Sequence, residues 1–148
     1  MLYSAGKKEQ SYLDLIDIKN FNCKDLKQLD TLWVKNSNGY FGYSVQKKIY
    51  LASGNSLDFD WEKGEWKNRN EKGYNDFTKS VGWKGKDGEW RRYEELPMNL
   101  KEETYGGMRG RSSYGELPFY YVYIVRDKSG SGWVFTPLFL QRLVNCSR

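Results

Sequence analysis

Few residues of this sequence have the types and the spacing that catalysis needs. Its 148 residues include no histidine, which excludes imidazole acid–base catalysis, histidine-activated nucleophiles and imidazole metal ligands. Neighbouring carboxylates occur at 94–95 and 102–103, but adjacent side chains on a helix point apart, so they do not form a catalytic pair. We therefore predict that the protein is not an enzyme and has no catalytic or metal-ligating residues.

A glycine-rich stretch with two arginines is a candidate for contact with an anion. Residues 106–111 read GGMRGR; they lack the GK[ST] ending of a phosphate loop, and no apolar strand precedes them. Arginines separated by glycine beside tyrosines are also typical of proteins that bind single-stranded nucleic acid. The net charge is +5, from 24 Lys and Arg against 19 Asp and Glu, and the sequence has no basic stripe elsewhere. Nucleic-acid binding is therefore an alternative and not the leading hypothesis.

The two cysteines, Cys23 and Cys146, lack the spacing of a metal site. We predict two reduced, mostly buried thiols in a reducing compartment, with a disulfide between them as the alternative. No stretch approaches the roughly 18 apolar residues of a membrane span, and the first residues, MLYSAGKKEQ, lack the apolar region of a signal peptide. We expect a soluble chain with at most peripheral association with membranes.

Aromatic residues are the conspicuous feature of the composition, at 17% of the chain. Such a share suits a core of packed rings or a binding face for a flat partner. The segment GYFGYSVQKKIYLASG, residues 39–54, concentrates these rings. On a helical wheel its apolar positions form two stripes, with Phe41, Val45, Ile49 and Ala52 on one side and Tyr43, Gln46 and Tyr50 roughly opposite. A helix with two stripes is either buried on both sides, as a central core helix, or packs on one side and binds a ligand with the other.

The rest of the pattern predicts a mainly α, compact domain over residues 12–148 after a flexible lead-in at 1–11. Helices are expected at 12–22, from a cap at Asp25 to a stop at Gly39, at 41–50, and from Thr136-Pro137 to the C-terminus. Residues 53–75 are expected to form a long loop or a loosely held helix that Trp61 and Trp66 anchor. A turn is predicted at 85–88.

Two further features are predicted between this turn and the last helix. Residues 101–118 are rich in glycine, which predicts a long mobile loop with Arg109 and Arg111 at its tip. The stretches 119–125 and 132–135 could form one small β-hairpin.

Two blocks of sequence, DIKNFNCKDLKQLDTLW at 17–33 and GYFGYSVQKKIY at 39–50, resemble the genomes-uncoupled-four family of porphyrin-binding regulators of magnesium chelatase. The likeness continues through SVGWKGKDGEWRRYEEL at 80–96, GELP at 115–118 and QRLVNC at 141–146. It covers residues 15–148 in consistent order. The sequence departs from the family pattern at Tyr43, where phenylalanine is usual, and at Glu116, where histidine is usual.

This resemblance implies a helical domain with a cupped hydrophobic face that binds protoporphyrin IX or Mg-protoporphyrin IX reversibly, with no covalent cofactor. It also implies a partner, the large subunit of magnesium chelatase, and a location in the cyanobacterial cytoplasm or the plastid stroma. The helices that normally precede the first block are largely missing, so a linear bilin or a different partner is an alternative. The ligand-binding residues implied are Phe41, Tyr43, Val45, Gln46, Ile49, Arg109, Arg111, Leu117 and Pro118. A nucleic-acid-binding module and a general protein-interaction domain are the functional alternatives.

Overall fold

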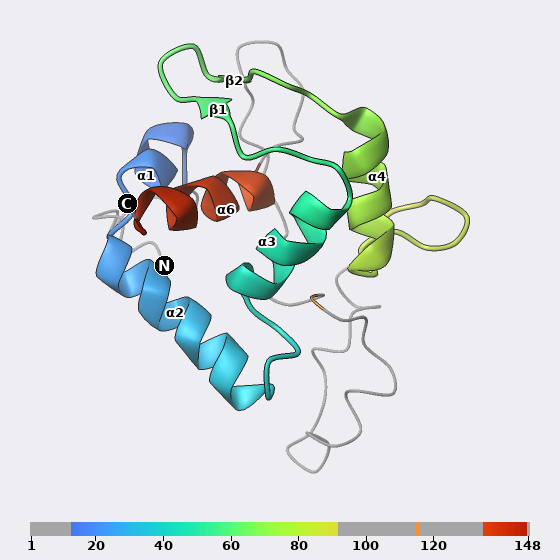
Figure 1. Cartoon of the computed structure of the whole chain (residues 1–148), viewed down its shortest axis with the longest axis horizontal. Helices are drawn as coiled ribbons and strands as arrows, with labels where there is room; N and C mark the ends of the chain where they lie inside the picture. The colour runs from blue at the N-terminus through green and yellow to red at the C-terminus, as the bar shows by residue number, and fades with distance from the viewer. Residues whose placement is uncertain (1–12, 92–114, 116–134, 148) are drawn as a thin grey trace.

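A computed structural model of the chain describes residues 13–91, 115 and 135–147. Over these residues the fold is mainly helical with one small antiparallel sheet, which confirms the predicted fold class (Figure 1). The elements in chain order are α1 (Leu15–Lys19), α2 (Cys23–Asn36), α3 (Tyr43–Ala52), β1 (Phe59–Asp60), β2 (Glu65–Trp66), α4 (Glu71–Ser80) and α6 (Phe135–Asn145).

The first two helices start at side-chain caps. Asp14 caps α1 by accepting a hydrogen bond of 2.9 Å from the Asp17 backbone N–H. The Asp17 carboxylate in turn accepts a hydrogen bond of 2.9 Å from the Asp14 backbone N–H. The cap of α2 is Asn22, whose side-chain oxygen accepts hydrogen bonds from the backbone N–H groups of Lys24 and Asp25. The predicted cap at Asp25 is therefore wrong: Asp25 lies inside the first turn, where its charge suits the positive helix end. Helix α1 is also shorter than the predicted span of 12–22.

Helix α2 ends as the sequence predicts. Gly39 has a φ of +78°, a conformation that glycine adopts without a side-chain penalty. Its N–H donates to the carbonyl of Val34 at 2.7 Å, which satisfies one of the last carbonyls of the helix. The next helix starts two residues later than predicted, because Gly42 has a φ of +134° and lies outside the helical region.

Helix α6 is the centre of the fold and packs against α1, α2 and α3 (Figure 1). Its Phe139 ring stacks on Tyr43 of α3 at 5.7 Å between centroids and meets Phe21 edge-on at 5.6 Å. These rings belong to a core cluster whose members include residues of each described helix and of β1. The helix begins at Phe135, so the predicted cap, Thr136, lies inside the helix, whereas Pro137 lies in the first turn as predicted; a first-turn proline loses no helical hydrogen bond.

Residues 53–75 were predicted to form a long loop or a loosely held helix, but they also contain the strands β1 and β2, and their last five residues begin α4. Phe59 pairs with Trp66 in the β1–β2 sheet, and Trp61 and Trp66 each meet the Phe59 ring with centroids 5.1 Å apart. Helix α4 then begins at Glu71, capped by Asn70. The sequence did not predict α4, because its residues are mostly polar and only Gly73, Phe77 and Thr78 are buried. The turn at 85–88 is confirmed by a 3.0 Å hydrogen bond from the Gly88 N–H to the Gly85 carbonyl.

Cys23 and Cys146 form a disulfide with their Cα atoms 5.4 Å apart, so the prediction of reduced, mostly buried thiols is wrong. Cys23 is the first residue of α2, and Cys146 follows the last residue of α6. Both are only partly buried. Beside them the Arg142 guanidinium donates two hydrogen bonds, of 2.8 and 3.0 Å, to the carbonyl of Phe21. Tertiary packing of α6 on α2 therefore brings together two residues that the sequence places 123 positions apart.

Two features fall elsewhere. The hairpin predicted at 119–135 lies outside the described residues, apart from Phe135, which belongs to α6. Within the described ranges, no helix combines the length and the apolar character that crossing a membrane needs.

Candidate functional site: helix α3 and its two faces

Helix α2 fixes the start of α3. The Asp30 carboxylate of α2 accepts a hydrogen bond of 2.8 Å from the Ser44 backbone N–H in the first turn of α3. A negative group at this end also complements the helix dipole. Gly42 allows the close approach: a Cβ there would lie 2.7 Å from Val34 Cγ2 and 2.9 Å from Asp30 Oδ1. A side chain at 42 would force Val34 or Asp30 to shift, and the φ of +134° would strain any residue other than glycine.

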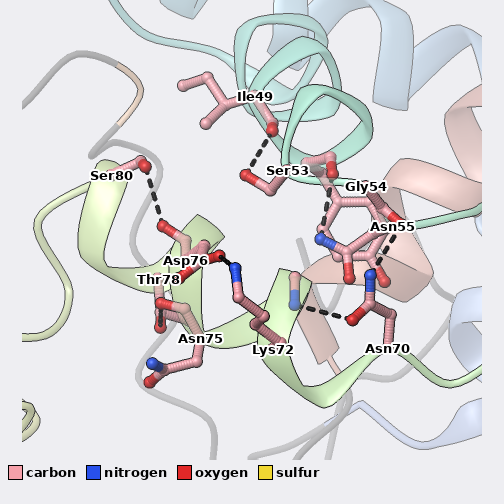
Figure 2. Close-up of polar contacts among 12 residues, drawn as sticks. Ile49, Ser53, Gly54, Asn55, Asn70, Lys72, Asn75, Asp76, Thr78 and Ser80 are labelled. Carbon is pink, nitrogen blue, oxygen red and sulfur yellow. Dashed lines mark hydrogen bonds and ion pairs between the residues drawn. The ribbon is translucent and has the colours of Figure 1, made fainter.

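Helix α4 fixes the other end of α3 (Figure 2). The side-chain amide of Asn70 donates to the carbonyl of Gly54 at 2.8 Å, while its oxygen accepts from the Gly73 N–H at 2.9 Å. The Asn55 amide donates to the carbonyl of Tyr50 at 3.0 Å. A Cβ at Gly73 would lie 2.6 Å from the Ser53 carbonyl oxygen. Because both ends are held, α3 can present its side chains in fixed positions.

One stripe of α3 belongs to the core. Tyr43 stacks on Phe139, and Tyr50 meets Phe77 of α4 edge-on at 5.2 Å. Burial is the main cause that raises the pKa of the Tyr50 hydroxyl above its ordinary value, with smaller contributions from Tyr74 and Asp58. Burial also raises the pKa of Tyr74 to about 12. Tyr43 and Tyr50 are thus buried on the side of α3 that faces α4 and α6.

The opposite stripe is apolar and mostly covered. Phe41 is 4% exposed and Val45 is 5% exposed, whereas Ile49 is partly exposed. The Phe41 ring meets Tyr40 and Trp33 edge-on, at 5.1 and 6.4 Å between centroids. We call Phe41, Val45 and Ile49 the apolar stripe.

Gly115 lies on the apolar stripe. A Cβ at this position would be 2.4 Å from Ile49 Cδ1, 3.4 Å from Val81 Cγ1 and 3.6 Å from Val45 Cγ1. The Gly115 N–H donates to the Tyr40 carbonyl at 3.0 Å, and its carbonyl accepts from the Gln46 side-chain amide at 3.0 Å. Its φ is +79°. The positive φ therefore favours glycine here, and a Cβ would also force the end of the Ile49 side chain to shift.

The structure places the residues that the resemblance implied in three groups. Val45 and Ile49 lie beside Gly115, and Phe41 precedes the helix and packs on Trp33; Tyr43 lies in the core; Gln46, 0% exposed, binds Gly115. Arg109, Arg111, Leu117 and Pro118, and the expected mobile loop at 101–118 apart from Gly115, lie outside the described residues. The ligand-binding roles of these residues stay predictions.

Sequence reasoning missed Gly115 as a partner of α3. Its signal was present, since Gly115 opens the GELP segment that contributes to the family resemblance. The part of the chain that the structure describes contains no cluster of three or more acidic or cysteine side chains able to hold a metal ion.

Comparison with known proteins adds an independent line of evidence. A family model described as GUN4-like matches residues 1–107. The "Ycf53-like protein" of Synechocystis sp. is 36% identical over 69 residues, which are 47% of this chain and 30% of that protein. The "Tetrapyrrole-binding protein, chloroplastic" of Arabidopsis thaliana is 38% identical over 58 residues, 39% of this chain and 22% of that protein. The matches thus span less than a third of either relative.

One solved structure is similar over most of the fold. The ligand-free structure of Arabidopsis thaliana GUN4 aligns with a TM-score of 0.51 at 25% sequence identity. The alignment covers 89% of this chain and 66% of that one.

Proposed function

The chain belongs to the GUN4-like family, and we propose on this premise that it binds a tetrapyrrole reversibly and acts as a regulator and not as an enzyme. The family match and the tetrapyrrole-binding name of the Arabidopsis relative support the ligand class. The observation that carries the proposal within this structure is the apolar stripe of α3, held at both helix ends and backed by the core. A rigid apolar surface suits a flat ring, because little is lost in ordering it on binding.

Protoporphyrin IX and Mg-protoporphyrin IX are the ligands we propose, with a linear bilin as the alternative. Ile49 is the partly exposed member of the stripe, so the ring would lie along Ile49 beside Gly115, with Phe41 and Val45 supporting it from below. Because the sequence has no histidine, a bound magnesium porphyrin would keep water or an oxygen ligand on its metal.

Arg109 and Arg111 are our proposed partners for the propionates of a porphyrin, with Leu117 and Pro118 adding apolar contact. Arginine forms charge-assisted hydrogen bonds with carboxylates, but exposed pairs contribute only about 0–1 kcal/mol. We expect that a porphyrin with esterified propionates still binds, more weakly, and that a double variant, Arg109→Ala with Arg111→Ala, no longer distinguishes ester from acid. Equal discrimination in variant and wild type would remove these arginines from the site.

We further propose that the protein stimulates magnesium chelatase through the large subunit, in the cyanobacterial cytoplasm or the plastid stroma. The names and sources of the relatives support this location, one being a cyanobacterial protein and one chloroplastic. A chelatase assay with and without the protein would test the regulatory part separately from binding.

The decisive binding experiment is a titration with protoporphyrin IX followed through its Soret absorbance and through tryptophan fluorescence. We expect saturable binding with a shifted Soret band. Binding of oligonucleotides with a steep salt dependence, and no response to porphyrin, would favour the nucleic-acid alternative. Saturation with neither ligand would favour a protein-interaction domain.

A further inference from the structure

Gly115 is held against α3 by its contacts with Tyr40, Gln46 and Ile49, and we call these contacts its seat. Its N–H and its carbonyl are both hydrogen-bonded, to Tyr40 and Gln46, and a Cβ on it would lie 2.4 Å from Ile49 Cδ1, so Ile49 would have to shift. Gln46, fully buried, reaches across 69 positions of sequence to make this contact. The seat thus connects the start of α3 to a distant part of the chain.

The seat adjoins the surface proposed for the ligand. The nearest side-chain atoms to a Cβ at Gly115 belong to Ile49, Val81 and Val45, two of which are members of the apolar stripe. The position of Gly115 therefore determines how much of the stripe is left uncovered and where its edge lies.

These contacts indicate that Gly115 stays on the apolar stripe, and they do not suit a residue that moves away when a ligand binds. Lifting Gly115 off the stripe would break two buried hydrogen bonds, and buried polar groups that lose their partners are costly. It would also release a glycine from a conformation that the surrounding contacts fit closely. A ligand would therefore bind beside Gly115 and use it as a fixed edge.

We propose that Gln46 is a positioning residue and not a ligand contact: its amide holds Gly115 on α3 and so preorganises one edge of the tetrapyrrole site. This inference rests on the proposed function. It assigns to Gln46 a role different from the direct contact that the family resemblance implied, and it adds Gly115 to the residues on which binding depends.

The test compares wild type with Gln46→Met, which keeps the length of the side chain but cannot donate. Two measurements are made on the full chain: the affinity for protoporphyrin IX, and hydrogen exchange of the Gly115 amide without ligand. Loss of one buried hydrogen bond should weaken porphyrin binding and speed the exchange, each by about fivefold. Gly115→Ala, whose Cβ would strike Ile49, should act in the same direction, and the double variant should be no worse than the stronger single one.

Thr78→Val is the matched control. The Thr78 hydroxyl, on a residue that is 0% exposed, also donates to a backbone carbonyl, that of Asn75 at 2.9 Å, but both residues belong to α4. This variant should lower stability while leaving porphyrin affinity and Gly115 exchange at the wild-type values. The comparison separates a specific effect on Gly115 from a general loss of stability.

Four results would overturn the inference, and they differ from one another. Faster Gly115 exchange with unchanged affinity would mean that the seat does not serve the site. Weaker binding with unchanged exchange would mean that Gln46 touches the porphyrin itself, and tighter binding would make Gly115 a removable cover. A wild-type chain that does not bind porphyrin would overturn the proposed function, and the positioning role with it.

Discussion

The Asp30 carboxylate of α2 accepts the backbone N–H of Ser44, the second residue of α3, at 2.8 Å. This contact does for α3 what a side-chain cap normally does, because Gly42 at the cap position has no side chain to offer. One carboxylate thereby sets both the start of α3 and its distance from α2.

Replacing this cap should therefore cost stability. We expect Asp30→Ala to lower the free energy of unfolding by about 0.5–2 kcal/mol, the usual range for loss of a helix cap. Asp30→Asn, which keeps an acceptor oxygen and loses the charge, should cost less. Urea denaturation followed by circular dichroism measures both changes. Wild-type stability in Asp30→Ala would show that the contact contributes nothing.

Val45 distinguishes the structural role of the apolar stripe from its proposed binding role. Because Val45 is 5% exposed, we expect Val45→Ala to lower the free energy of unfolding by about 1 kcal/mol or more, as truncation of a buried aliphatic side chain does. Porphyrin affinity, measured at a temperature where both proteins are folded, should fall as well if the ring rests on the stripe. Unchanged affinity beside a large loss of stability would assign Val45 to the core alone.

The disulfide should contribute strongly to stability. Cys23 and Cys146 enclose most of the chain, and such a link removes many conformations from the unfolded state. We expect Cys146→Ser to lower the free energy of unfolding by about 2–5 kcal/mol. Cys23→Ser should cause the same loss, and the double variant should add little to either.

A thiol count gives the direct check on this bond. Unfolding without reductant should release no free thiol in the wild type, and unfolding with reductant should release two, one from each cysteine. Free thiols before reduction would return both cysteines to the reduced state that the sequence predicted.

Tyr74 should resist ionisation in the folded protein. Burial raises its pKa to about 12, whereas an unfolded chain ionises tyrosine near about pH 10. Because the folded-state pKa is the higher one, the corresponding stability is present below about pH 10 and is lost as the pH rises toward 12. Absorbance of phenolate against pH would show this late titration, and Tyr74→Phe should reduce it by one tyrosine while the late titration of Tyr50 remains. A full complement of phenolate near pH 10 in the folded protein would contradict it.

Local signals made part of the fold predictable. The two stripes of residues 39–54 indicated α3, and Gly39 indicated the end of α2, because helix periodicity and a left-handed glycine are encoded within a few residues. Helix α4 escaped detection because its buried side is narrow and its remaining surface is polar. Strands of two residues, like β1 and β2, are too short to show an alternating pattern.

The candidate site was predictable only in part, for a different reason. The stripe of Phe41, Val45 and Ile49 follows from spacing alone, but the partner of Gln46 lies 69 residues away and the partner of Cys23 lies 123 away. Tertiary packing creates such pairs, and no local pattern specifies them. The contact between Gln46, a residue that the family resemblance implied for ligand binding, and Gly115 is of this kind.

The bond between Cys23 and Cys146 also makes a covalent ring of everything between these residues. A protease that cuts once inside this ring leaves a molecule whose two pieces stay joined, so its mass rises by one water and no fragment is lost until a reductant is added. The chain segments before Cys23 and after Cys146 leave the ring from a single junction.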